Sequence, residues 1–502
     1  MKQGYQNLIG HLKSNHPDYL ETFHQAQQLP SNSKVFNDVV IARSTTLNHP
    51  CDVTSTNVFK WLEWIVRDEL ELNFCERKLT RKNTTLAQIS KKTLKKYMFR
   101  TVRAMENLIT TAVNETSKFA LVFDGWSGDD SHFTALFVTC PGSKSTTEPH
   151  VFLLAFSELL DETCFKATNH TEFIRLTLDT YNLQEEKLIC MIGDNLPTNK
   201  LVADLMSVPL VGCRSNRLNL AIEDYITEHL GNECEKVEKL ISKVSTLREF
   251  KHLSRPVRRN VTRLVEVTDM FERLELLLPS LHTGYSEVAK FMPTDSQLNI
   301  IRQQKKALDD FKSITKTLKS RETTISDTQT LFQSLIIEFP NFDFDHYLGI
   351  DAPIIHSSVF ETAIIKIQNC EQNEMSSEEK LAVKGLTTQF VTDPLLNNDD
   401  DDLSFAERAL KRKRLNTMSC KDYVNTNFVL PTSNDVKRLF SKSKRELCSQ
   451  RRSSSRSTLQ ALMFLKFNRN LWDLALVNEI VNANDNDNED EEDESSDDED
   501  TE

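Results

Sequence analysis

The stretch Leu188-Ile189-Cys190-Met191-Ile192-Gly193-Asp194-Asn195 predicts a buried β-strand that ends in a carboxylate. A short apolar run stopped by Gly-Asp-Asn is typical of a strand inside a sheet. Pro197 follows where the first turn of a helix accepts a proline, and an amphipathic run continues to Met206. Because ligands of open α/β sheets gather at the carboxyl ends of the strands, Asp194 is the first candidate for a functional residue.

A second strand-like run, residues 119–124, ends in another aspartate, Asp124. Two further β-rich runs follow at residues 132–140 and 150–156. The turn-forming Gly, Asp, Ser and Pro residues between the three runs predict a three-stranded antiparallel meander. Asp124 therefore stands at the end of the first strand of this meander.

Two helices and a last strand complete this region. A helix predicted at residues 172–183 precedes the Asp194 strand, and a helix at 198–206 and a strand at 208–213 follow it. Meander, helix, strand, helix, strand is the plan of an RNase H-like domain, an α/β fold with a mixed sheet. In that plan the first and fourth strands are neighbours, so we expect Asp124 and Asp194 to lie together.

The composition is that of a large chain of two or three domains, with 502 residues and ten scattered cysteines. None of the cysteines forms a C-x-x-C pair, which favours reduced thiols over a disulfide framework. We find no apolar run near 18 residues and no signal-like amino terminus. We therefore expect a soluble intracellular protein without a membrane partner.

The net charge of −13 comes from the last residues of the chain. Thirteen of the 74 acidic residues lie in 483–502, and the remaining 61 equal the lysines and arginines in number. Residues 481–502 are therefore predicted to be a disordered acidic tail on a neutral body. Such a tail can keep the protein soluble, repel or mimic DNA, or bind basic partners.

The region before the first strand is predicted to contain half of a zinc site and several helices. His11 and His16 in residues 1–25 have zinc-ligand spacing, but no cysteine precedes them, so we expect no bound zinc. Residues 26–112 show helical spacing of apolar positions. The polar face of the second helix in this region can follow a DNA backbone or simply face water. Its basic residues include Lys91, Lys92, Lys95 and Lys96.

The rest of the chain is predicted to be mainly helical. Residues 231–396 form an all-α insertion, broken at several prolines, between a first part of the RNase H-like core (113–230) and its completion (421–480). Residues 397–420 form a charged linker, in which Lys411-Arg412-Lys413-Arg414 can serve as a nuclear import signal.

An apolar helix is predicted near the end of the completing segment. Its apolar surface needs a partner, which is either the sheet or a second subunit, and the sequence leaves both readings open. The residues concerned are Leu459, Leu462, Met463, Leu465, Leu471 and Trp472.

Several motifs together resemble the hAT family of DNA transposases, in the family's order, over roughly residues 1–475. The His11/His16 pair resembles the end of a BED-type zinc finger, and residues 464–473 resemble the family's carboxyl-terminal dimerisation region. The other matching stretches are Phe123-Asp124-Gly125-Trp126, Gly193-Asp194-Asn195, Cys213-Arg214-Ser215-Asn216-Arg217-Leu218-Asn219-Leu220 and residues 431–441.

The resemblance implies a nuclear cut-and-paste transposase whose RNase H-like core is split by a helical insertion. Such a core holds two Mg²⁺ ions, about 3.5–4 Å apart, with an Asp-Asp-Glu triad. Asp124 and Asp194 match the first two triad positions. DNA contact is implied for Asn216 and Arg263. A dimer or higher homo-oligomer is implied through Leu439, Phe440, Leu459, Leu462, Met463, Leu465, Leu471 and Trp472.

The third triad position departs from the family pattern. The glutamate should stand just before the arginine of an Arg-x-Phe-Ser motif, and this chain has Lys437 there. Asp435 points about 200° away round a helix, and Glu446 lies on roughly the opposite face some 13 Å along the axis. Neither residue is expected to replace the missing ligand, so we expect weak or no Mg²⁺ binding.

Two more departures from the family pattern affect residues that the resemblance places near the active site or in contact with DNA. The family's Cys-x-x-His has become Cys213-x-x-Asn216, and its Thr-Arg-Trp has become Thr262-Arg263-Leu264. The sequence therefore favours a transposase-derived nuclear protein that is catalytically impaired and retains dimerisation and some DNA affinity. The alternatives are an active transposase whose third carboxylate comes from elsewhere, and a protein-interaction module without a DNA role.

Overall fold

The computed structural model describes residues 52–128, 131–142, 148–158, 167–246, 264–281, 286–387, 423–447 and 456–483. These residues belong to the second of two structural units into which the chain divides, residues 51–502. Several features predicted above lie outside the described residues: the His11/His16 pair, Arg263, the charged linker at 397–420 and the acidic residues after 483.

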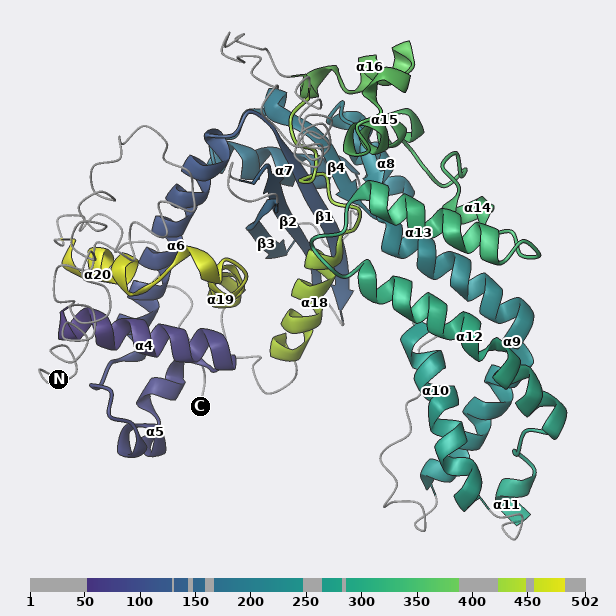
Figure 1. Ribbon diagram of the computed structural model, residues 1–502. Helices are drawn as coiled ribbons and strands as arrows, with labels where there is room; N and C mark the ends of the chain where they lie inside the picture. Colours follow the sequence, from purple (N-terminus) through teal and green to yellow (C-terminus); the bar gives the residue numbers. More distant parts are fainter. Residues whose placement is uncertain are drawn as a thin grey trace, which may run out of the picture. The chain divides into compact units, whose positions relative to one another are not determined.

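A single five-stranded mixed sheet lies at the centre of the described chain (Figure 1). The order of the strands across the sheet is β3-β2-β1-β4-β5. The first three strands form the predicted antiparallel meander, whereas β1 with β4 and β4 with β5 pair in parallel. The strands are β1 (Phe119–Gly128), β2 (Ser131–Cys140), β3 (His150–Glu158), β4 (Leu188–Gly193) and β5 (Leu210–Gly212).

Helices cover the central strands, which explains their unbroken apolar runs. All six residues of β4 are buried, and so are the side chains of Phe119 and Phe123 in β1. Two amphipathic helices connect the strands and pack against each other: α7 (Ala167–Thr180) before β4 and α8 (Pro197–Leu205) after it. Pro197 is the first residue of α8, as predicted, because that position needs no backbone N–H partner.

Helices from both ends of the described chain pack together beside the sheet. Helix α20 contacts α4 and α6, and α19 contacts β3 as well as α6. Trp472 is buried there, with Phe59 against it at 5.7 Å between ring centroids. The helices are α4 (Val53–Asp68), α5 (Lys78–Asn83), α6 (Lys91–Asn114), α19 (Arg456–Phe467) and α20 (Leu474–Asn482).

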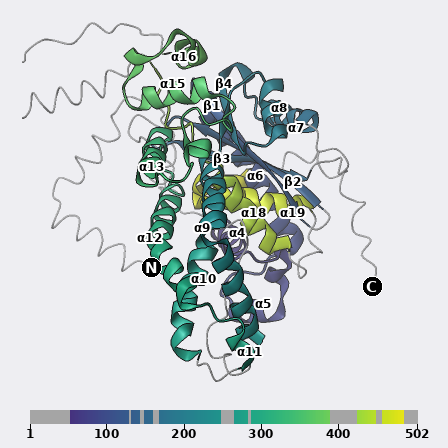
Figure 2. The same ribbon diagram turned by 90° about the vertical axis from the view of Figure 1, so that its right-hand side faces the viewer.

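The predicted helical insertion has its own apolar core. Helices α9, α10 and α12 pack against one another and run side by side in Figures 1 and 2. Their core runs from Leu218 to Leu348 and includes Phe311 and Phe332. The helices are α9 (Arg214–Thr246), α10 (Leu264–Leu277), α11 (Ser286–Ala289), α12 (Asp295–Thr317), α13 (Ile325–Glu338) and α14 (Asp345–Leu348).

The insertion begins earlier than predicted. The sequence places a domain boundary between residues 230 and 231, but α9 is one continuous helix across it. Its buried face keeps helical spacing through Ile226, Leu230, Cys234 and Val237, so no break in packing occurs there. The insertion therefore starts directly after β5.

Three more helices complete the described chain. Helix α15 (Ser358–Gln368) packs between α13 and α16 (Ser377–Ala382), and α18 (Asn434–Leu447) packs against β1 and β2. None of the helices in the described ranges is both long and apolar enough to span a lipid bilayer.

The eight residues assigned above to a dimer surface lie in the core of this single chain. All are 8% exposed or less. Their partners are the sheet and the amino-terminal helices, since α19 packs on β3, α6 and α4. The sequence left open whether the sheet or a second subunit covers this apolar surface. In the structure the chain's own sheet and helices cover it, and no second subunit is needed to bury it. The residues are Leu439, Phe440, Leu459, Leu462, Met463, Leu465, Leu471 and Trp472.

Candidate functional site

Asp124 and Asp194 stand at equivalent positions of two adjacent parallel strands. Val122 pairs with Ile192, and each aspartate follows two residues later in its own strand or just beyond it. Asp124 is 9% exposed, and its Oδ1 accepts a hydrogen bond from the Gly125 N–H at 2.9 Å. The Asn199 side-chain amide donates to the Asp194 carbonyl at 3.0 Å, which holds the turn before α8. The strand register therefore brings together the two carboxylates, as the sequence predicts.

Lys437 reaches this pair of carboxylates from α18. Its Nζ lies 3.3 Å from Asp194 Oδ1 and 3.8 Å from the Cys213 Sγ. The segment leading into α18 is held beside the sheet by two hydrogen bonds: Arg214 N donates to the Pro431 carbonyl, and Ser433 N donates to the Cys213 side-chain sulfur. Lys437, the residue compared above with the third triad position, is thus part of the site and carries an ammonium group.

The pKa values of Asp124 and Lys437 are shifted by burial and by the charges around them. Burial, followed by the charge of Asp194, raises the pKa of Asp124 from 3.8 to about 7, although Lys437 and the Gly125 N–H act in the opposite direction. Burial by itself would lower the pKa of Lys437, but Cys213, Asp194 and Asp124 outweigh it and raise the pKa above its ordinary value. Lys437 therefore stays protonated, while Asp124 is about half protonated near pH 7.

The donor set does not fit a two-metal centre. Two carboxylates suit hard divalent cations, but a protonated amine offers no lone pair and repels them. Among the described residues, no group of three or more His, Cys, Asp or Glu side chains is placed to hold a metal ion. The ammonium of Lys437 instead supplies the positive charge next to Asp194.

Asp435 does not replace the missing ligand. It is buried, and its Oδ1 accepts hydrogen bonds from Arg321 at 2.7 Å and from Arg438 at 3.1 Å. Asp435 thus pairs with two arginines, whereas Lys437 pairs with Asp194, in agreement with the helix geometry predicted above. The side chain of Glu446 lies outside the described residues.

Of the described residues predicted to contact DNA, Asn216 lies beside this site and the α6 lysines do not. Asn216 is half-buried in the first turn of α9, and its backbone N–H donates to the Cys213 carbonyl at 3.0 Å. Lys91, Lys92 and Lys96 are exposed on α6, with Lys95 half-buried beside them and its Nζ over the Phe99 ring. The lysines therefore belong to the group of amino- and carboxyl-terminal helices, away from the strand ends.

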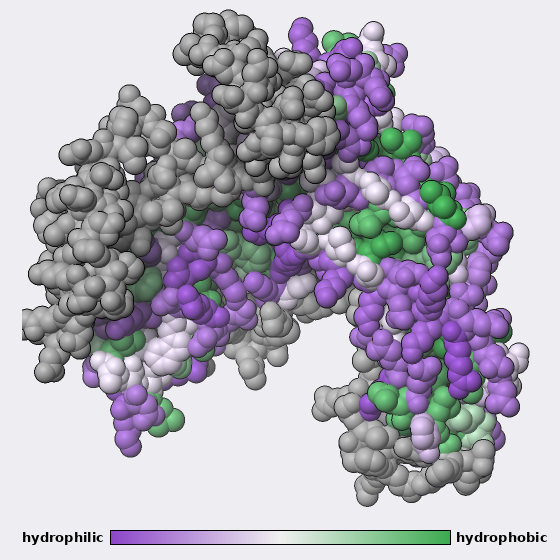
Figure 3. Space-filling view, in the orientation of Figure 1, coloured by the Kyte–Doolittle hydropathy of each residue, from purple (hydrophilic) through white to green (hydrophobic). Residues whose placement is uncertain are grey.

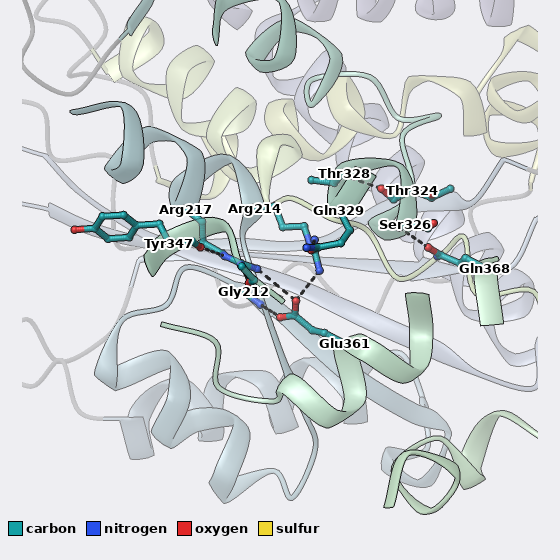
Figure 4. A network of polar contacts seen from close by, with 11 residues as sticks. Gly212, Arg214, Arg217, Thr324, Ser326, Thr328, Gln329, Tyr347, Glu361 and Gln368 are labelled. Carbon is teal, nitrogen blue, oxygen red and sulfur yellow. Dashed lines mark hydrogen bonds and ion pairs between the residues drawn. The ribbon is translucent and has the colours of Figure 1, made fainter. Parts of the chain in front are cut away.

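A buried charge network next to the site was not predicted from the sequence (Figure 4). Glu361 on α15 accepts hydrogen bonds from Arg214 Nη2 at 2.9 Å and from Gly212 N at 3.1 Å. Arg217 Nη1 lies 3.6 Å from the same carboxylate, and all three charged side chains are almost fully buried. Glu361 thus links β5 and the start of α9 to α15.

The two arginines also bind the helices around them. Arg214 donates to the Gln329 side chain at 2.8 Å, and Arg217 donates to the Tyr347 and Gly349 carbonyls, both at 2.9 Å. Burial and the charge of Arg214 lower the pKa of Arg217 to about 10, although Glu361 acts in the opposite direction. Both arginines belong to the Cys213–Leu220 motif, which could have identified them as important residues. Nothing in the sequence around Glu361 identifies it as their partner.

Comparison with known proteins gives matches among solved structures. No protein-family model and no curated protein sequence matches the chain. Among solved structures, the chain is similar to a Drosophila P element transposase in its strand transfer complex, with 9% sequence identity and a TM-score of 0.31. The match covers 92% of this chain and 99% of that chain.

Proposed function

We propose that this protein derives from a hAT-type DNA transposase and no longer cuts DNA by metal-dependent chemistry. In this proposal the mixed sheet is an RNase H-like core, and Lys437 occupies the position of the third metal-binding carboxylate. The observation that carries the proposal is the 3.3 Å contact between Lys437 Nζ and Asp194 Oδ1. It supports a site whose carboxylates are balanced by an internal cation.

The energetic argument concerns competition between Lys437 and a divalent cation. A Mg²⁺ ion bound by Asp194 would stand within a few ångströms of a fixed ammonium group, in a partly buried site where screening is weak. Lysine also lacks the oxygen that the third ligand must supply. Without a bound metal, the site lacks the Lewis acid that would activate water and stabilise a leaving 3′ oxygen in two-metal chemistry.

The remaining function proposed here is binding to DNA in the nucleus, with self-association as a homodimer or higher oligomer through residues other than the eight that the chain itself buries. Support for DNA binding comes from the exposed lysines Lys91, Lys92 and Lys96 on α6. Support for the hAT assignment comes from the motif residues around Asp124, Asp194 and Cys213.

Lys437→Glu tests the proposal. We expect the variant to bind Mn²⁺, observed by electron paramagnetic resonance and as an upward shift of Tm with Mn²⁺, because three carboxylates then face one another. The wild-type protein should show neither effect. Nicking of a supercoiled plasmid in Mn²⁺ should be absent in wild type and present at a measurable rate in Lys437→Glu.

Lys437→Met is the matched control, since it removes the cation without adding a ligand, and it should not gain the Mn²⁺ site. Mn²⁺-dependent nicking by the wild-type protein, abolished by Asp194→Ala, would refute the proposal and establish the active-transposase alternative. In that case a third carboxylate must come from outside the described residues.

A further inference from the structure

One face of the molecule combines basic side chains from two helices, and we call it the basic face. On α5 the residues Lys78, Arg81 and Lys82 are exposed and share one side of the helix, opposite the buried Thr80. The first turn of α6 adds the exposed residues Lys91 and Lys92. Hydrophilic side chains reach the surface at α5, at the lower left of Figure 3.

The two parts of the basic face are held together. Glu76, just before α5, accepts a hydrogen bond from the Lys91 N–H at 2.9 Å, and Arg81 Nε donates to the Cys75 carbonyl at 3.3 Å. The nearby Glu71 is paired with Arg77 at 2.7 Å. The Glu76 carboxylate already lies at the positive end of the α6 dipole, so the positive charge of the basic face comes from its five exposed lysine and arginine side chains. The face therefore favours an anionic occupant.

The chain carries a strongly anionic segment directly after α20. Residues 484–502 contain thirteen acidic residues and no lysine or arginine. The segment follows α20, which ends at Asn482 and packs against α4 and α6, the helix that supplies Lys91 and Lys92. Nineteen residues reach up to about 60 Å when extended, which is longer than the roughly 36 Å of the whole of α6.

We propose that residues 484–502 dock on the basic face of the same chain and compete there with nucleic acid. Tethering gives the segment an effective concentration in the millimolar range, which compensates for the weakness of each solvent-exposed ion pair. Salt screens such contacts within about 10 Å at 0.1 M. The competition with nucleic acid rests on the proposed DNA-binding function, whereas the docking does not.

Zero-length cross-linking of the full chain tests the docking. A carbodiimide joins a lysine amine to a carboxylate only where the two are in contact, and peptide mass spectrometry identifies the pair. We expect Asp and Glu of 484–502 to be linked to Lys78, Lys82, Lys91 and Lys92 at 50 mM salt, and at least about fivefold fewer links at 500 mM salt.

Two controls decide what the links mean. The exposed pair Lys305→Gln/Lys306→Gln on α12 should leave the yield unchanged, whereas equal linking of 484–502 to Lys305 and Lys306 would overturn the proposal. A mixture of ¹⁵N-labelled and unlabelled protein should give links within one chain. Links that are mainly between chains would assign the face to a second copy and overturn docking in the same chain.

DNA binding tests the competition separately. A full-length variant with the thirteen acidic residues of 484–502 changed to Asn and Gln should bind a 20-base-pair duplex about tenfold more tightly than wild type at 50 mM salt, as measured by fluorescence anisotropy. Equal affinities would overturn the competition. If neither protein binds DNA, the proposed DNA function fails, and the cross-links still decide whether the segment docks.

Discussion

At the scale of single residues, the main feature is a cluster of two carboxylates and one ammonium at the ends of β1 and β4. Lys437 neutralises Asp194 directly and Asp124 from further away, so the cluster is close to charge balance without a metal. The ionised form of Asp124 is destabilised, because this residue is buried and lies near a second carboxylate. Its raised pKa makes a pH effect on stability measurable.

We expect Asp124 to lower the stability of the folded protein as pH rises. Its pKa is about 7 in the folded protein against an ordinary 3.8, so the folded state holds the proton more firmly than the unfolded chain. The resulting stabilisation is full below pH 4, declines between pH 4 and 7, and is lost above pH 7. Its size is on the order of 3 kcal/mol.

Asp124→Asn tests this effect, because the amide keeps the shape and cannot ionise. Urea unfolding in EDTA at pH 5, 6, 7 and 8 should show a flatter pH profile for the variant than for wild type, with the variant the more stable at pH 8. Asp309→Asn, at an exposed position of α12, should keep the wild-type profile. Parallel profiles for Asp124→Asn and wild type would contradict the prediction.

At the scale of the elements, α9 shows how one helix connects two parts of the molecule. It begins beside the candidate site and continues into the core of the insertion without a break. Gly231 lies in its middle, at the domain boundary that the sequence predicts. A Cβ added to Gly231 meets no atom within 4 Å.

Gly231→Ala should therefore stabilise the protein by roughly 0.5–1 kcal/mol in urea unfolding, because alanine loses less backbone entropy in a helix. Gly212→Ala is the contrasting variant, since its Cβ would lie 2.2 Å from Asn195 Oδ1 and force that side chain to move. It should destabilise the protein by about 1–3 kcal/mol. A loss of stability in Gly231→Ala would show that residue 231 is not helical.

The elements near the site were predictable because their signals are local. The apolar run before Asp194 and the alternation in the meander identify the strands, and the plan of strand and helix places Asp124 beside Asp194. The partner of the apolar α19 was not predictable, because an apolar face has the same pattern whether a sheet or another subunit covers it. The sequence position of Lys437 pointed to the site only through the family motif.

At the scale of the whole molecule, buried charges join the insertion to the sheet. Arg214 and Arg217 start α9 at the edge of β5, and Glu361 approaches them from α15 after a separation of 147 residues for Arg214. No local pattern identifies such a pair, and its members are recognised only when the fold brings them together. Two guanidinium groups face one carboxylate, so the network depends on Glu361.

Removing the charge of Glu361 should loosen this junction. Glu361→Gln keeps the size of the side chain but leaves two buried cations without a counterion, which we expect to cost about 3–5 kcal/mol in urea unfolding. Glu338→Gln is the matched control, because Glu338 and its partner Lys306 are 58% and 77% exposed. Exposed pairs contribute about 0–1 kcal/mol, so the control should stay near wild type. Equal losses in the two variants would mean that Glu361 does not hold the insertion on the sheet.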